Sequence, residues 1–298
     1  MKRATLRWMR IGAGTLAALC AGTALGQSFS GHYPIGVEGL KAGSLPPPGV
    51  YLRDYNVYYF ADRLNDANGD KVPGDLDLSA YANAIRPIWI TDWKLLGGSY
   101  GMDVLVPIIY TDFSINGMGD SSFGVGDLFV EPITLSWHWK QADLGVGYGF
   151  WAPTGNSSLR SPAKPGKGYW GHMLTLGGTW YPDAAKTWSV SVLGRYEINM
   201  EHEDIDIRPG DELSIEGGIG KSLSKSVEVG VVGYMQRQVT GDSGRTPTPH
   251  DRVFGVGPEV NLFCPKLATF FSIRYLYEFG AEDRPEGNTV TVTLTRRF

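Results

Sequence analysis

Residues 288–298 read NTVTVTLTRRF, and their side chains alternate between two kinds. Val290, Val292, Leu294 and Phe298 fall on even positions, whereas threonines occupy every odd position from 289 to 295. In an extended strand, successive side chains point to opposite faces. The stretch therefore predicts a β-strand with one apolar face and one polar face.

The same alternation recurs along the chain. In residues 188–200, Trp188, Val190 and Val192 share one face, while Ser189 and Ser191 share the other. Twelve such segments can be drawn, at 50–61, 75–90, 98–110, 125–139, 143–151, 168–181, 188–200, 211–223, 227–240, 251–263, 269–279 and 288–298. Most reach the roughly 9–11 residues of a tilted membrane strand and exceed the roughly 5–6 of an ordinary strand.

Two segments fit the pattern less well. The phase of 125–139 changes around Pro132, which predicts a bulge. The segment 75–90 loses its alternation after Ala84.

The connections between segments alternate in length. The longer ones are 62–74, 111–124, 152–167, 201–210, 241–250 and 280–287; the shorter ones are 91–97, 140–142, 182–187, 224–226 and 264–268. An outer-membrane barrel with an even number of strands has this arrangement, with long loops at one end. We therefore predict an all-β fold, a transmembrane antiparallel up-and-down β-barrel of about 12 strands in the bacterial outer membrane. The alternative is a secreted β-sandwich with a dry core.

The first residues predict export. Residues 1–26 combine a basic start, a short apolar run and a small-residue ending, as in a signal peptide. We expect 27–49 to be a periplasmic or lumen-plugging segment that includes Pro46–Pro48, and 50–298 to be the barrel. Removing residues 1–26 changes the formal charge from −4 to −8, because it takes four cations and no anion. An acidic chain of this kind argues against nucleic acid as a partner.

Two motifs carry a family resemblance. Residues 37–51 read VEGLKAGSLPPPGVY, and residues 124–128 read GVGDL, followed by Pro132. Together they resemble the SphA-like, meta-pathway phenol-degradation (Phenol_MetA_deg) family of outer-membrane proteins. The resemblance implies a barrel that transports hydrophobic or aromatic compounds, and it implies neither an enzyme of phenol degradation nor known site residues.

If the apolar faces meet lipid, the polar faces line the lumen. The charged residues expected there, and offered as a possible solute path, are Asp54, Asp103, Arg195, Glu197, Glu216, Glu228, Glu259, Arg274 and Glu278. Buried charges must pair or meet water. They form either a structural salt-bridge network or a polar eyelet that selects solutes.

Catalytic and metal-binding motifs are weak. Ser136 and His138 share a parity but lack a lipase-like motif, so no catalytic residue is assigned. Asp66, Asn68 and Asp70 have the spacing of a calcium loop, but Lys71 replaces its glycine, so a solvated turn is the simpler interpretation. No cofactor is expected.

The leading functional prediction is therefore passive uptake or export of small, hydrophobic or aromatic molecules. A non-conducting structural or surface-binding barrel is the alternative, and a lipid-modifying enzyme is the third possibility. The expected partners are outer-membrane lipids, a small-molecule solute, and the barrel-assembly machinery through the C-terminal Phe298.

Overall fold

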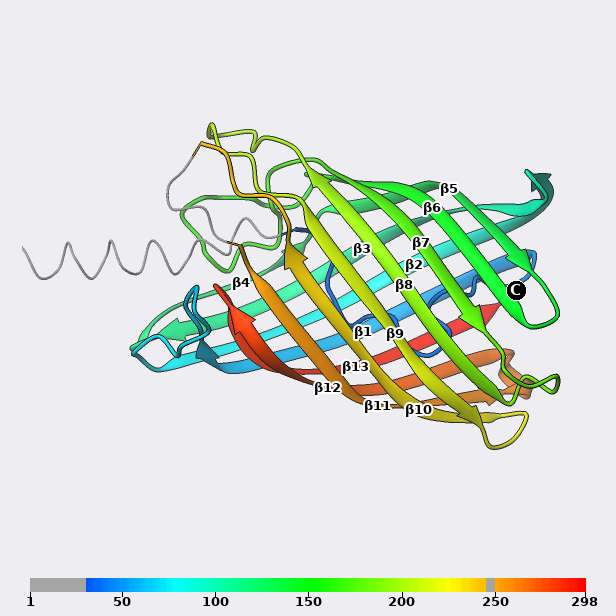
Figure 1. Cartoon of the computed structure of the whole chain (residues 1–298). Helices are drawn as coiled ribbons and strands as arrows, with labels where there is room; N and C mark the ends of the chain where they lie inside the picture. The colour runs from blue at the N-terminus through cyan, green and yellow to red at the C-terminus, as the bar shows by residue number, and fades with distance from the viewer. Residues whose placement is uncertain (1–30, 245–249) are drawn as a thin grey trace, which may run out of the picture.

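The computed structural model describes residues 31–244 and 250–298, and most of these residues lie in β-strands (Figure 1). The strands are β1 (Gly49–Leu64), β2 (Leu76–Leu95), β3 (Gly98–Ile115), β4 (Met118–Val125), β5 (Leu128–His138), β6 (Ala142–Ala152), β7 (Gly171–Trp180), β8 (Trp188–Asn199), β9 (Glu212–Ser222), β10 (Val227–Gln238), β11 (Arg252–Cys264), β12 (Thr269–Glu282) and β13 (Pro285–Arg297). Among these described residues, no helix has the length and apolar character needed to cross a membrane. The signal peptide predicted for 1–26 lies outside the described residues and stays a prediction.

The strands close into a barrel. Each strand pairs antiparallel with its neighbours, β1 pairs with both β2 and β13, and β2 also pairs with β3. β4 pairs with the upper half of β3 (Ile108–Ile115), and β5 pairs with its lower half (Ser99–Leu105). β4 and β5 therefore form one interrupted strand, and the wall has the twelve positions predicted. A closed wall of this kind rules out the β-sandwich.

The break between β4 and β5 lies at Gly126 and Asp127. It faces Pro107 of β3, which has no amide hydrogen to give to the ladder and instead accepts a hydrogen bond from Gly126 N at 2.9 Å. A second irregularity lies at Pro132, where the register of β5 shifts against both β3 and β6. The bulge predicted at Pro132 is thus confirmed.

The prediction of a loop at 111–124 is wrong. Most of these residues extend β3 and β4, and the turn between them is Asn116–Gly117, with φ of 53° and 77°. Asn-Gly with positive φ at both positions is the sequence favoured by a two-residue hairpin turn. The hairpin lacks an apolar row, which hid its strands from the alternation test. The expected loop at 280–287 is likewise a tight turn between β12 and β13.

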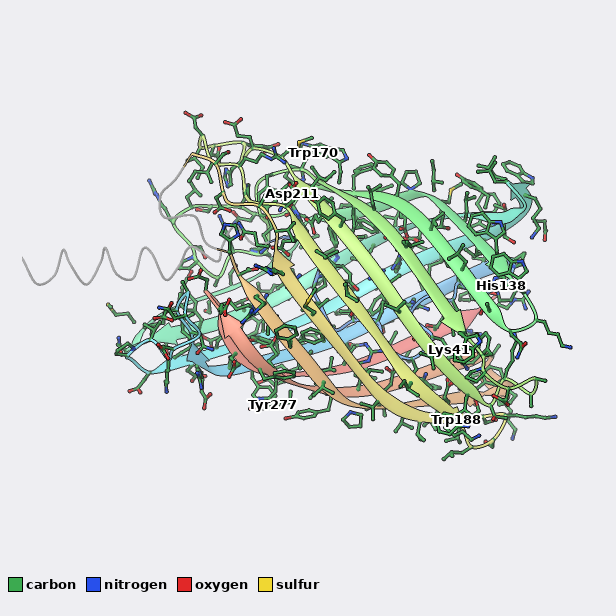
Figure 2. All side chains as sticks on the ribbon, viewed as in Figure 1. Lys41, His138, Trp170, Trp188, Asp211 and Tyr277 are labelled. Atoms are coloured by element: carbon green, nitrogen blue, oxygen red, sulfur yellow. The ribbon has the colours of Figure 1, made fainter. Side chains whose placement is uncertain are left out.

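The two rows of each strand differ in burial as predicted. On β12, Ile273 and Tyr277 are 50% and 53% exposed on the outside, whereas Arg274 and Glu278 are buried inside. Trp188 and Tyr277 project from the outer surface in Figure 2. A continuous apolar outer band of this kind is suited to acyl chains, and its aromatic residues suit the membrane interfaces. The chain is therefore an outer-membrane β-barrel.

The barrel has two unlike ends. The connections 65–75, 153–170 and 200–211, together with residues 239–244 and 250–251, gather at one end, called the long-loop end from here on. The turns at 96–97, 139–141 and 223–226 lie at the other, the short-turn end, where β1 begins and β13 ends. Four of the six connections predicted to be long are therefore long, and the other two are the tight turns described above.

An arginine on the outer wall should destabilise the barrel only where lipid covers it. We expect Val192→Arg, on the outward row of β8, to lower the free energy of unfolding in lipid vesicles by about 2–4 kcal/mol. Leu159→Arg is the control, because Leu159 is similarly exposed (49% against 55% for Val192) but lies in a long loop. Its effect should stay within about 0.5 kcal/mol. Urea titration monitored by tryptophan fluorescence measures both, and equal losses would contradict a lipid-facing Val192.

Candidate functional site

The chain that precedes β1 lies inside the barrel (Figure 1). Residues 31–48 are called the lumen segment from here on. The amide of Gly31 donates a hydrogen bond to Glu212, the first residue of β9 at the long-loop end. Ser44 Oγ donates to Asp143 Oδ2 over 2.7 Å, near the short-turn end. The lumen segment therefore runs through the interior from one end of the barrel to the other.

Carboxylates of the wall satisfy the backbone of the lumen segment. A buried amide without a strand partner needs another acceptor. The pairs are His32 N to Glu197 Oε1 at 2.9 Å, Gly36 N to Glu216 Oε2 at 2.8 Å, Glu38 N to Glu216 Oε2 at 3.2 Å and Leu40 N to Glu259 Oε2 at 3.0 Å. These inward-facing glutamates thus hold an irregular segment in place.

Close approach to the wall also requires small residues in the lumen segment. A side chain at Gly39 would overlap the carboxylate of Glu259 and the guanidinium of Arg274. A side chain at Gly43 would overlap the backbone of Gly178 on the facing strand, β7. Glycine therefore fits these two positions because the segment lies against the wall there.

His32 anchors the end of the lumen segment near the long loops. Its Nδ1 lies 2.7 Å from Glu197 Oε1, and its Nε2 lies 3.4 Å from Asp127 Oδ2. The ring stacks against Trp151 at 5.5 Å between centroids and meets the edge of Tyr169 at 4.6 Å. The His32 ring is therefore held between two carboxylates and two aromatic rings.

Glu38 places a negative charge among three arginines in the middle of the lumen. Arg53 Nη1 donates to Glu38 Oε1 at 3.1 Å, and the Tyr55 hydroxyl donates to the same oxygen at 2.7 Å. The Glu38 carboxylate is therefore held by an ion pair with Arg53 and a hydrogen bond from Tyr55, and it lines the same cavities as Arg86 and Arg195.

The structure brings most of the predicted lumen residues together. Asp103, Arg195, Glu197, Glu216, Glu228, Glu259, Arg274 and Glu278 are all buried. Their partners include Arg86 for Asp103 (2.8 Å), Arg195 for Glu216 (3.3 Å), Arg274 for Glu259 (2.8 Å) and Lys41 for Glu228 (2.9 Å). Glu278 accepts hydrogen bonds from the hydroxyls of Tyr59 and Tyr234 at 2.8 and 2.7 Å.

The prediction that Asp54 lines the lumen is wrong, because Asp54 lies on the outer face of β1. It shares that row with the exposed Leu52 and Tyr58, while Tyr51 and Tyr55 are buried on the inner row. Its carboxylate accepts a hydrogen bond from Asn83 Nδ2 at 2.6 Å, across the β1–β2 ladder. Both rows of β1 carry aromatic residues, so parity alone could not choose between them.

Several lumen residues escaped the sequence analysis. Arg86 donates to Asp103 and also to Glu131, with Nη2–Oε2 at 2.7 Å. Arg86 lies just beyond Ala84, where the alternation of its segment fails, and Glu131 lies at the Pro132 bulge. Arg53 occupies the inner row beside Asp54. Arg53 lies two positions after Tyr51, so assigning Tyr51 to the inner row would have placed Arg53 there as well.

The cavities beside the lumen segment include two of different character. The larger one, about 860 Å³, lies toward the short-turn end and is called the vestibule; charged side chains such as Lys41, Glu228 and Arg297 line it. The smaller one, about 150 Å³, is called the upper chamber and has mostly apolar walls. Four residues line both cavities, namely Val37, Glu38, Arg86 and Arg195. The cluster around Glu38 therefore separates them.

The weak catalytic and calcium candidates do not gain support. His138 Nδ1 lies 3.0 Å from Asp143, while Ser136 Oγ is buried with no hydrogen-bond partner among the described residues. The carboxylate of Asp66 accepts hydrogen bonds from the amides of Asn68 (2.9 Å) and Asp70 (3.0 Å), as in a polar turn. Within 31–244 and 250–298, no three His, Cys, Asp or Glu side chains group as a metal site.

Comparison with known proteins places this geometry in context. The chain is similar to the COG4313 outer membrane channel from Pseudomonas putida F1, with a TM-score of 0.73 at 15% identity over 90% of this chain and 100% of that one. It is also similar to the transport unit of the autotransporter AIDA-I from Escherichia coli, with a TM-score of 0.53 at 10% identity over 93% and 97% of the two chains. Likenesses at these identities show the fold.

No curated protein matches the chain. A family model, however, matches residues 61–294, which is most of the chain and nearly all of the barrel. The family is described as "Putative MetA-pathway of phenol degradation", and it is the family that the motifs at 37–51 and 124–128 resemble. The chain belongs to this family.

Proposed function

We propose that this protein is a passive outer-membrane channel for small hydrophobic or aromatic molecules, and that the lumen segment narrows its pore. One observation carries the proposal: a closed wall encloses two cavities that meet at a single charged cluster around Glu38. The similar barrel from Pseudomonas putida F1 is named an outer membrane channel, and the description of the family refers to phenol degradation. Both descriptions agree with transport of small molecules.

A non-conducting barrel is the competing function. The lumen segment and the ion pairs fill much of the interior, which favours a sealed structure. The vestibule, however, holds about 860 Å³ and carries charges of both signs, as expected for a hydrated pore. Ion-conducting steps of the purified protein in a planar bilayer support the channel, and their complete absence would leave a structural barrel.

Removing the lumen segment should widen the pore. We expect deletion of residues 27–47 to raise single-channel conductance several-fold, because the segment occupies the axis of the barrel. The deletion removes one cation, Lys41, and one anion, Glu38, so the formal charge of the lumen stays the same and the conductance is the quantity that reports the change.

The control for the deletion is to show that the variant still folds into a closed barrel. Heat-modifiable mobility on gels and circular dichroism should show a closed barrel in both proteins. Unchanged conductance in a folded deletion variant would show that residues 27–47 do not obstruct the pore.

Glu38 should set the ion selectivity of the intact channel. Glu38→Gln keeps the shape of the side chain but leaves the positive charges of Arg53, Arg86 and Arg195 without its compensation. We expect the cation-to-anion permeability ratio to fall at least about twofold, as charged rings in pores predict.

Reversal potentials across a salt gradient measure this change. Glu282→Gln is the matched control, because Glu282 pairs with Arg252 at the long-loop end, away from the cluster. Identical reversal potentials for wild type and Glu38→Gln would place the ion path elsewhere.

We also infer that the protein is not an enzyme. Lipid hydrolysis would need a nucleophile that is hydrogen-bonded to a general base. The Ser136 hydroxyl is buried in the wall and makes no such hydrogen bond among the described residues. Purified wild type should release no more fatty acid from phospholipid vesicles than Ser136→Ala. Hydrolysis that disappears in Ser136→Ala would instead establish the enzymatic function.

We propose that Phe298 contacts the barrel-assembly machinery. Its amide donates to Val50 O at 3.0 Å, which ties the end of the chain to β1. Its ring remains 68% exposed at the short-turn end. A terminal aromatic ring in this position is accessible to a protein that inserts the barrel.

A further inference from the structure

The upper chamber has mostly apolar walls. Ala82 and Ala84 of β2, Leu105 of β3, Phe129 of β5, Trp151 of β6 and Met173 of β7 face the lumen there. Other parts of the inward row mix charged and hydroxyl residues with apolar ones such as Ile88 and Leu276.

The lumen segment closes the inner side of this chamber. Tyr33 and Val37 pack in one cluster with Phe129, Trp151 and Met173. Ala84 and Leu105 of the wall also pack against this cluster. A space of about 150 Å³ remains beside it, and Ala82 and Ala84 are among the residues that line this space.

The volume of the chamber limits what it can hold. An engineered cavity of about 150 Å³ lined by Leu, Ile and Phe stays dry and binds benzene. A chamber of this size accommodates one benzene-sized ring with a small substituent, but not an extended acyl chain or a fused polycyclic molecule.

The charges at the rim select against ionic ligands. Arg86, Arg195 and Lys167 border the chamber. Arg86 and Arg195 each already pair with a carboxylate, at 2.8 and 3.3 Å, and Lys167 lies near the carboxylates of Glu212, Glu197 and Asp127. His32 borders it on the other side and contacts Glu197 and Asp127. A ligand carboxylate would have to displace one of these buried partners, whereas a neutral ring needs only the apolar walls.

We propose that the upper chamber is a binding site for one neutral single-ring molecule, held between Trp151, Phe129 and the alanines of β2. The site lies on the path of the proposed channel, so the inference rests on the proposed function for the route that the ligand takes, but not for binding itself. A bound ring leaves toward the vestibule only past Glu38, since the residues shared by the two cavities surround that carboxylate.

The test uses 4-fluorotoluene as a fluorine NMR probe with the purified full-length protein in detergent. Ring currents of Trp151 and Phe129 should shift the resonance of the bound probe away from that of probe dissolved in micelles. We expect a saturable shift in the wild type. Ala84→Leu adds three carbon atoms inside the chamber and should weaken binding at least tenfold.

The matched control is Thr293→Leu. Thr293 also faces the lumen, but it lines the vestibule, so a leucine there leaves the upper chamber unchanged. Its binding curve should match that of the wild type. Equal shifts in wild type and folded Ala84→Leu would overturn the proposal.

Two further measurements keep the outcome decisive if Ala84→Leu does not fold. Ala82→Leu fills the same chamber from the adjacent inward position of β2. In the wild type, toluene should displace the probe, whereas 1,3,5-triisopropylbenzene should not because it exceeds the chamber; equal displacement by both would refute a size-limited site.

Bilayer recordings separate this inference from the proposed function. Binding without conductance would leave the site intact and refute the channel. Conductance without saturable binding would support the channel and refute the site.

Discussion

Hydrogen bonds from the backbone amides of the lumen segment to buried glutamates determine the interior of this barrel. An irregular segment inside a wall of paired strands has no ladder to join, and each unpaired buried group costs about 1–3 kcal/mol. Glu197, Glu212, Glu216 and Glu259 provide the missing acceptors from β8, β9 and β11. With the backbone held there, Val37 faces the apolar side of the wall and Glu38 reaches the arginines.

The charges of the interior follow from the same arrangement. Arg53, Arg86, Arg195 and Arg274 each have a carboxylate partner, and Glu38 belongs to the lumen segment instead of the wall. The salt-bridge network and the selective eyelet, which the sequence presents as alternatives, therefore share residues. The ion pairs around Glu38 that fix the lumen segment also lie at the boundary between the two cavities.

How much of the structure the sequence could predict depends on how clearly each strand separates an apolar row of side chains from a polar row. β8, β12 and β13 are divided cleanly, so their faces and lumen residues follow from alternation. β1 carries aromatic residues on both rows, and Asp54 was misplaced for this reason. Arg86 was missed because the alternation of its segment fails after Ala84. The partners of the lumen glutamates could not be predicted, because Gly36 and Glu216 are 180 positions apart and no pattern links them.

The order of the two cavities along the axis favours neutral solutes over ions. An ion that moves from the hydrated vestibule past Glu38 must give up water and then meet mostly apolar walls, where Arg86 and Arg195 are already paired with carboxylates. A neutral ring meets the opposite balance, since it loses little at the charged cluster and gains contact with Phe129 and Trp151 in the chamber. The apolar residues of the chamber, among them Ala82 and Ala84, thereby favour neutral molecules that are poorly soluble in water.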